Sequence, residues 1–191
     1  MIPHSHPTFG AWLEKAGARF RVWAPRRTHV ELILEDRVGE ARPLEKAEDG
    51  TFSGFVPGVR VGQLYRYRLD GEGPFPDPAS RFQPQGVHGP SEIVDPGRFP
   101  WSDDEWRGVG LEELIIYELH VGTFSSAGTF AGVRERLPYL SDLGVTAIEL
   151  MPVAAFAGRW NWGYDGVALF APIVRAGFIT PRDSAKMPSM A

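Results

Sequence analysis

IIYELHVGTF (115–124), GVTAIELMPV (144–153) and RWNWGYDGVALFAP (159–172) are the segments that decide the fold class of this chain. The nearly continuous apolar run over 114–121 is typical of a parallel strand that is covered on both faces. The run over 145–153 predicts a second strand, and the spacing leaves room for a crossover helix between the two. The order of strand, helix, strand and aromatic loop predicts the start of a (β/α)8 barrel.

The stretch between the two strands predicts one amphipathic helix. Thr129 is a good N-cap residue, and Gly144 supplies the stop. Pro138 inside the run removes a hydrogen bond and predicts a kink. The apolar residues at helical spacing are Phe130, Val133, Leu137, Leu140 and Leu143.

The length of the chain limits how much of a barrel it can contain. A complete (β/α)8 barrel needs about 250 residues, whereas the whole chain has 191. We therefore expect a barrel truncated after strand two, over 112–172. Residues 173–191 form a divergent tail with weak apolar patterning, which favours a truncated or frame-shifted gene product.

Composition excludes several classes of function. The net charge is −4, so nothing indicates a nucleic-acid or membrane partner. Without cysteine, neither a disulfide framework nor a thiolate metal site can form. The N-terminus has no signal-peptide pattern, and no apolar run approaches the roughly 20 residues that span a bilayer. A cytoplasmic location is the expectation.

The N-terminal part, residues 1–72, predicts an antiparallel β-sandwich. Phe20 and Val22 alternate with polar neighbours, and later segments repeat this period of two. Asp49 and Gly50 predict a hairpin turn. Trp23 on the outer face is either a glycan platform or an interface residue.

Residues 73–111 form a Pro-rich connector. Seven prolines exclude regular strand or helix across much of it. Its apolar content nevertheless predicts an ordered strap, and His88 within it is expected to be a surface or hydrogen-bonding residue. The expected anchors of the strap are Phe82, Ile93, Phe99, Trp101 and Trp106.

The loop after the second strand is the candidate binding site. Trp160, Trp162 and Tyr164 alternate in a glycine-containing segment, and Asp165 adds an acceptor for sugar hydroxyl groups. Aromatic rings stack well on the apolar faces of sugars. Trp162, Tyr164 and Asp165 are therefore the predicted substrate-binding residues. The alternative is a surface loop that packs on a neighbouring domain.

The strands themselves offer weaker candidates. Alternation places Ile116, Glu118 and His120 on one face of the first strand, and Glu149 on the matching face of the second. Glu118 and Glu149 suggest an acid/base pair, but buried carboxylates of a barrel more often pair with cations, so we reject it. His120 is expected to support the site from behind rather than to act as a base. No metal-ligand cluster is present in the pattern.

These segments together resemble the start of the catalytic domain of the α-amylase superfamily, glycoside hydrolase family 13. PDPASRFQPQGVHGPSEIVDP (76–96), ahead of YELHVGTF, resembles in particular the connector of the maltooligosyltrehalose trehalohydrolases. The resemblance implies that an immunoglobulin-like, carbohydrate-binding-module-like sandwich precedes the barrel. It also implies that Tyr164 stacks on the sugar at the cleavage subsite.

The resemblance implies hydrolysis of the α-1,4-glucosidic linkage of maltooligosyltrehalose, which releases trehalose and needs no cofactor. The family's retaining mechanism uses carboxylates from strands four, five and seven. No catalytic residue is therefore expected in this chain, which should be inactive by itself. The alternatives are a fragment of a glycogen branching or debranching enzyme, or a non-catalytic glycan-binding module.

Overall fold

The computed structural model describes residues 8–37, 39–158 and 164–173. The chain divides into two compact units, each described here by itself. The sandwich unit contains Met1–Asp95, Ala154–Ala157 and Val167–Pro172. The helical unit contains Pro96–Val153, Gly158–Gly166 and Ile173–Ala191.

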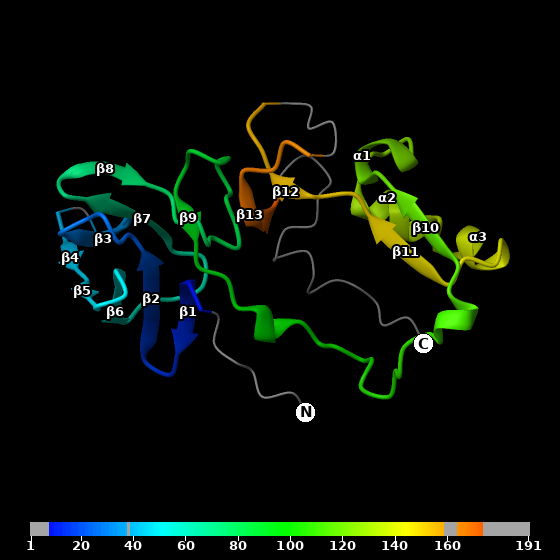
Figure 1. The fold of residues 1–191 in the computed structure, drawn as a ribbon, viewed down its shortest axis with the longest axis horizontal. Helices are drawn as coiled ribbons and strands as arrows, with labels where there is room; N and C mark the ends of the chain where they lie inside the picture. Colours follow the sequence, from blue (N-terminus) through cyan, green and yellow to red (C-terminus); the bar gives the residue numbers. More distant parts are fainter. Residues whose placement is uncertain (1–7, 38, 159–163, 174–191) are drawn as a thin grey trace. The chain divides into compact units, whose positions relative to one another are not determined.

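Two antiparallel sheets form the sandwich unit, at the blue-to-green end of the ribbon (Figure 1). The first sheet has the order β1-β2-β6-β5, with β1 (Gly10–Glu14), β2 (Gly17–Trp23), β5 (Glu45–Lys46) and β6 (Thr51–Pro57). The second has the order β4-β3-β7-β8, with β4 (Ala41–Pro43), β3 (Val30–Leu34), β7 (Leu64–Leu69) and β8 (Glu72–Phe75); β9 (Ser91–Glu92) also pairs with β7. The predicted antiparallel sandwich is confirmed.

The core of the sandwich follows directly from the alternation in the sequence. Phe20 and Val22 of β2 are buried, whereas Trp23 is 60% exposed. Across the core lie the inward residues of the second sheet, because successive side chains of a strand point to opposite faces. These are Val30, Leu32, Leu34, Tyr65 and Tyr67, joined by Phe52 and Ile93.

The predicted hairpin turn at Asp49 and Gly50 joins β5 to β6. Gly50 has φ +80°, and a Cβ atom there would lie 2.5 Å from the Cα atom of Pro25. Only glycine meets both conditions without strain. The Ala47 N–H group donates to the Thr51 carbonyl oxygen at 2.7 Å and closes the turn.

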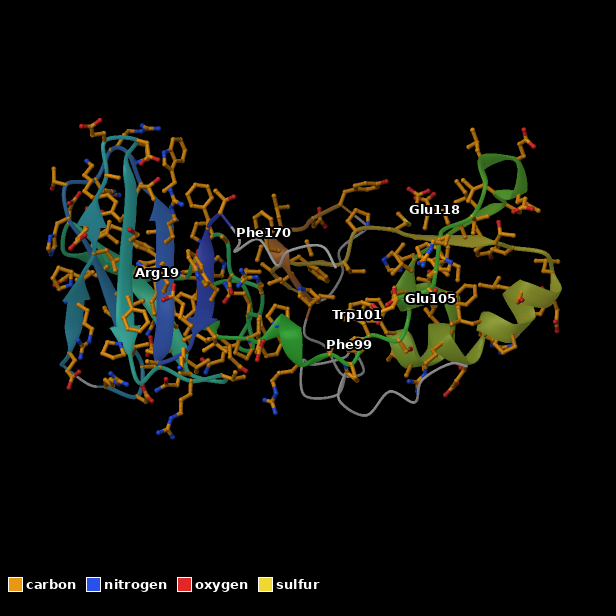
Figure 2. All side chains as sticks on the ribbon, turned by 90° about the horizontal axis from the view of Figure 1, so that it is seen from below. Arg19, Phe99, Trp101, Glu105, Glu118 and Phe170 are labelled. Carbon is orange, nitrogen blue, oxygen red and sulfur yellow. The ribbon has the colours of Figure 1, made fainter. Side chains whose placement is uncertain are left out.

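The connector is partly sheet and partly exposed chain. β8 and β9 add two short strands to the second sheet, and Phe82 and Ile93 are buried as predicted. The predicted anchors Trp101 and Trp106 are wrong, because each is 69% exposed. All of the residues from 100 to 110 are exposed, so no second layer of the described structure covers these rings. Phe99 is half-buried, and its ring packs edge-on against the Trp101 ring with 4.5 Å between the ring centroids (Figure 2).

Two short 3-10 turns, η1 (Pro96–Arg98) and η2 (Leu111–Glu113), precede the parallel strand pair of the helical unit (Figure 1). β10 (Ile116–Leu119) and β11 (Ala147–Leu150) pair in parallel, as the sequence predicted. Three short helices lie between them in the chain: α1 (Val121–Phe124), α2 (Phe130–Glu135) and α3 (Leu137–Asp142).

The stretch predicted as one kinked helix, from Thr129 to Gly144, is two helices, α2 and α3. The Thr129 side chain caps α2 by accepting from the Gly132 N–H group at 3.1 Å. The helix breaks at Arg136, and Pro138 falls in the first turn of α3, where its missing N–H group costs least. Gly144, with φ +94°, then ends α3 as predicted.

Only one face of the parallel pair is covered in the described structure. Leu119 and Val121 are buried against Val133 and Leu140 of the helices. On the opposite face, Ile116 is 56% exposed. We expected both faces of the parallel pair to be covered, and this is wrong for the described residues. No described element packs over the face that carries Ile116.

A small antiparallel pair completes the sandwich unit. It consists of β12 (Ala154–Ala155) and β13 (Ala168–Pro172), whose pairing contains a register shift. Its small side chains form an apolar cluster with Val87 of the connector.

Candidate functional site

The predicted sugar-contact residues lie in the connection between β12 and β13. Tyr164 is 75% exposed, and Asp165 beside it is also exposed. Trp162, the third predicted residue, lies outside the described residues, as does Trp160. The Tyr164 ring and the Asp165 carboxylate are thus accessible to a ligand. They lie close together because they are consecutive in the chain.

The base of this connection is held by backbone pairing. The Val167 N–H group donates to the Ala155 carbonyl oxygen at 2.8 Å, and Ala155 faces Ala168 in the strand register. Asp165 is therefore only two residues from a hydrogen-bonded position. Pairing at the base restricts where the side chains before β13 can lie.

His120 follows β10 and is the N-cap residue of α1. Its ring is half-buried, and its Nδ1 atom lies 3.4 Å from the Thr123 hydroxyl group. A Cβ atom at Gly122 would come within 3.0 Å of the ring, so the glycine makes room for it. These local contacts orient the imidazole but join it to neither Tyr164 nor Asp165, so its supporting role stays a prediction.

Glu118 and Glu149 are direct neighbours across the parallel pair, as the sequence predicted. Both side chains are exposed (Figure 2 labels Glu118). No ion pair joins either carboxylate to a cation within residues 8–37, 39–158 and 164–173. Like charges placed opposite one another repel, so this pair destabilises the two strands as they stand.

The sequence reasoning missed a buried carboxylate in the connector. Asp77 is 1% exposed and accepts hydrogen bonds from the Tyr65 hydroxyl group at 2.7 Å and the Tyr67 hydroxyl group at 3.4 Å. Its other oxygen accepts from the Ala79 N–H group at 2.8 Å. Burial raises the pKa of Asp77, and these hydrogen bonds oppose the rise. An aspartate between two prolines was the available signal.

The outer face of the first sheet carries exposed rings and cations. The Trp23 indole N–H group donates to the Asp49 carbonyl oxygen at 3.1 Å, which leaves the ring 60% exposed. Arg19, labelled in Figure 2, lies over the Phe55 ring at 5.9 Å. Exposed rings of this kind suit either a sugar or a neighbouring domain, so both interpretations of Trp23 stay open.

No group of three or more His, Asp or Glu side chains in the described ranges is arranged to hold a metal ion. None of the described helices has the length and hydropathy needed to cross a bilayer.

Comparison with known proteins shows which families and structures this chain is similar to. Residues 8–96 match the family Carbohydrate-binding module 48 (Isoamylase N-terminal domain). A malto-oligosyltrehalose trehalohydrolase of Saccharolobus solfataricus is 51% identical over 165 residues, which are 86% of this chain and 29% of that protein. A trehalohydrolase of Deinococcus radiodurans is 44% identical over 162 residues, or 85% of this chain and 26% of that protein. The predicted resemblance is confirmed.

Comparison with solved structures agrees with the sequence comparison. A crystal structure from Salmonella typhimurium, provisionally described as an alpha amylase, superposes with a TM-score of 0.83 at 41% identity. The match covers 94% of this chain and 30% of that one. The chain thus spans less than a third of the length of each of these three relatives.

Proposed function

We propose that this chain, a relative of the malto-oligosyltrehalose trehalohydrolases over most of its length, is part of a glycoside hydrolase of the α-amylase superfamily. The activity proposed for the whole protein is hydrolysis of the α-1,4-glucosidic linkage of maltooligosyltrehalose, which releases trehalose for trehalose biosynthesis. The observation that carries the proposal is the 51% identity to a named trehalohydrolase over 86% of the chain.

Within this proposal, the described elements have definite places. The sandwich is the immunoglobulin-like module, and β10, α2, α3 and β11 are the first βαβ unit of a (β/α)8 barrel. The proposed division is 1–72 sandwich, 73–111 connector, 112–172 barrel start and 173–191 tail; in the structure, β8, β9, β12 and β13 belong to the sandwich unit. Active sites of such barrels lie at the carboxyl ends of the strands, and β11 leads in sequence towards Tyr164 and Asp165.

The proposed roles at the site follow from exposure and chemistry. The Tyr164 ring stacks on a glucose unit, the Asp165 carboxylate accepts hydrogen bonds from sugar hydroxyl groups, and Trp162 adds a second ring. His120 supports this region. A retaining hydrolase also needs a nucleophile and an acid. The resemblance assigns both to barrel strands that would follow β10 and β11. The proposal retains the expected cytoplasmic location, with which the cysteine-free sequence is consistent.

A chimera tests the activity. Residues 1–172 would be joined to the remainder of the Saccharolobus solfataricus relative, with the intact relative as the positive control. We expect the chimera to release trehalose from maltooligosyltrehalose and the 191-residue chain to release none. A folded chimera that transfers glucan branches instead of releasing trehalose would favour the branching-enzyme alternative.

Variants of the chimera test Tyr164. Replacing the ring in Tyr164→Ala should lower kcat/KM by about two orders of magnitude, because a face that supports the distorted sugar is lost. Tyr164→Phe keeps the ring and should cost much less. A residue that is 75% exposed contributes little to folding, so the melting temperature should stay near that of the parent. A destabilised but fully active Tyr164→Ala would defeat the assignment.

The match of residues 8–96 to a carbohydrate-binding family favours a second candidate function, glycan binding by the sandwich itself. Trp23 would then be the platform. Titration of residues 1–110 with maltotetraose, beside a Trp23→Ala variant, tests it. Maltotetraose binding that is lost in Trp23→Ala supports glycan binding by the sandwich. If no binding depends on Trp23, the interpretation of Trp23 as an interface residue is favoured.

A further inference from the structure

The β12–β13 pair is too small to be stable by itself. Its register contains two paired positions, Ala154 with Pro172 and Ala155 with Ala168, and the register shifts between them. An isolated two-stranded hairpin is marginal in water even when it is regular. The pair therefore needs packing from another part of the sandwich unit.

Val87 of the connector supplies such packing. It is 6% exposed and forms one buried cluster with Ala155, Ala168 and Ala171. The three alanines present only methyl groups, so Val87 is the largest side chain of the cluster. Contact with both β12 and β13 lets one side chain hold the two strands together.

Hydrogen bonds tie the region around Val87 to the core of the sandwich. The Gly86 N–H group donates to the Gln83 carbonyl oxygen at 3.2 Å, and the neighbouring Phe82 carbonyl oxygen accepts from the Glu92 N–H group of β9 at 2.9 Å. The hydroxyl group of Ser91, which precedes Glu92, lies 3.4 Å from the buried Gln83 side chain. Ser91 in turn accepts from the Asp77 N–H group at 3.0 Å. Asp77 binds the Tyr65 hydroxyl group in the core. The position of Val87 is thus set by the second sheet.

We infer that Val87 is a positioning residue for Tyr164 and Asp165. It holds β12 against β13, and Asp165 precedes the first hydrogen-bonded residue of that pair, Val167, by two positions. Through the chain link to Val167 alone, this anchoring limits how far the two exposed side chains can move from the start of β13. The part that concerns the glucan rests on the proposed function, whereas the anchoring of the hairpin does not.

The anchoring is tested by amide hydrogen exchange on the full 191-residue chain, followed residue by residue by NMR. Val87→Ala removes the contact. Val59→Ala is the matched control, because Val59 is 5% exposed and belongs to the sandwich core instead of this cluster. Val87→Ile, which keeps an apolar side chain, is the rescue variant. Exchange of the Val167 N–H group should be roughly tenfold faster in Val87→Ala than in Val59→Ala, and near wild type in Val87→Ile.

Positioning is tested by titrating the same variants with maltotetraose, with the amide signals of Tyr164 and Asp165 as the readout. The affinity should fall about fivefold in Val87→Ala and stay at the wild-type value in Val59→Ala and Val87→Ile. A Tyr164→Ala variant measures how much of the binding depends on the ring.

The outcomes separate the two proposals. Equal Val167 exchange in Val87→Ala and Val59→Ala overturns the anchoring. Faster exchange with unchanged, Tyr164-dependent affinity overturns positioning and leaves Val87 a purely structural residue. Affinity that does not change in Tyr164→Ala removes the sugar contact and with it the proposed site, while the exchange result still decides the anchoring.

Discussion

The buried Asp77 carboxylate leads to a prediction whose size can be worked out from the structure. Tyr65→Phe removes the hydroxyl group that donates to it at 2.7 Å and leaves the ring in the core. Hydrogen bonds to charged groups contribute about 1.5–3 kcal/mol. We therefore expect Tyr65→Phe to lower the free energy of unfolding by about 2 kcal/mol at neutral pH.

Tyr67→Phe is the internal control. Both tyrosines are 1% exposed and donate to the same Asp77 oxygen, but the Tyr67 distance is 3.4 Å. That length exceeds the usual range for a hydroxyl donor. The loss in Tyr67→Phe should stay below about 1 kcal/mol. Geometry alone thus distinguishes the two variants.

The loss in Tyr65→Phe should also depend on pH. Burial raises the pKa of Asp77 above its ordinary value of 3.8, and the Tyr65 hydrogen bond lowers it, so the pKa rises further in the variant. A raised folded-state pKa means that the folded protein holds the proton more tightly than the unfolded chain. Stability then falls as pH rises from the unfolded value through the folded one. In the variant this fall continues to higher pH, so the deficit is larger at about pH 7 than at about pH 4.

Urea denaturation followed by tryptophan fluorescence at both pH values measures these free energies. A deficit in Tyr67→Phe equal to that in Tyr65→Phe would refute the distance argument. A Tyr65→Phe deficit that is the same at both pH values would refute the assignment of the donor to an ionised carboxylate.

Three further predictions concern the helical unit. Thr129→Ala removes the cap of α2 and should cost about 1 kcal/mol of stability, and an unchanged denaturation midpoint would contradict the cap. Glu118→Gln relieves the repulsion from Glu149 and should raise stability by a few tenths of a kcal/mol at low salt, a gain that high salt should abolish. Hydrogen exchange should show stronger protection over 18–70 than over 114–153, because the parallel pair has an uncovered face. Equal protection would mean that this face is covered in solution, for example by a second copy.

Local pattern was enough to predict much of the fold. The strands around Phe20 and Tyr65 follow from a period of two, and the ends of the crossover follow from Thr129 and Gly144. These features depend on neighbours within a few residues, where side-chain direction and backbone preference act directly. The aromatic loop over 159–172, with its resemblance to a known family, led in the same way to the prediction of Tyr164 and Asp165 as sugar contacts.

The sequence by itself therefore determined the longer strands of the sandwich, the parallel pair, the caps and the family, since each is encoded over short distances along the chain. The short strands β8, β9, β12 and β13 were not predicted. Only the tertiary structure decided that Trp101 is exposed and Asp77 is buried, because burial depends on which distant segments pack together. Tertiary structure also decided that Val87 lies against Ala155 and Ala168, residues far from it in sequence. No sequence periodicity predicts such a contact, since it forms only when the connector packs against the β12–β13 pair.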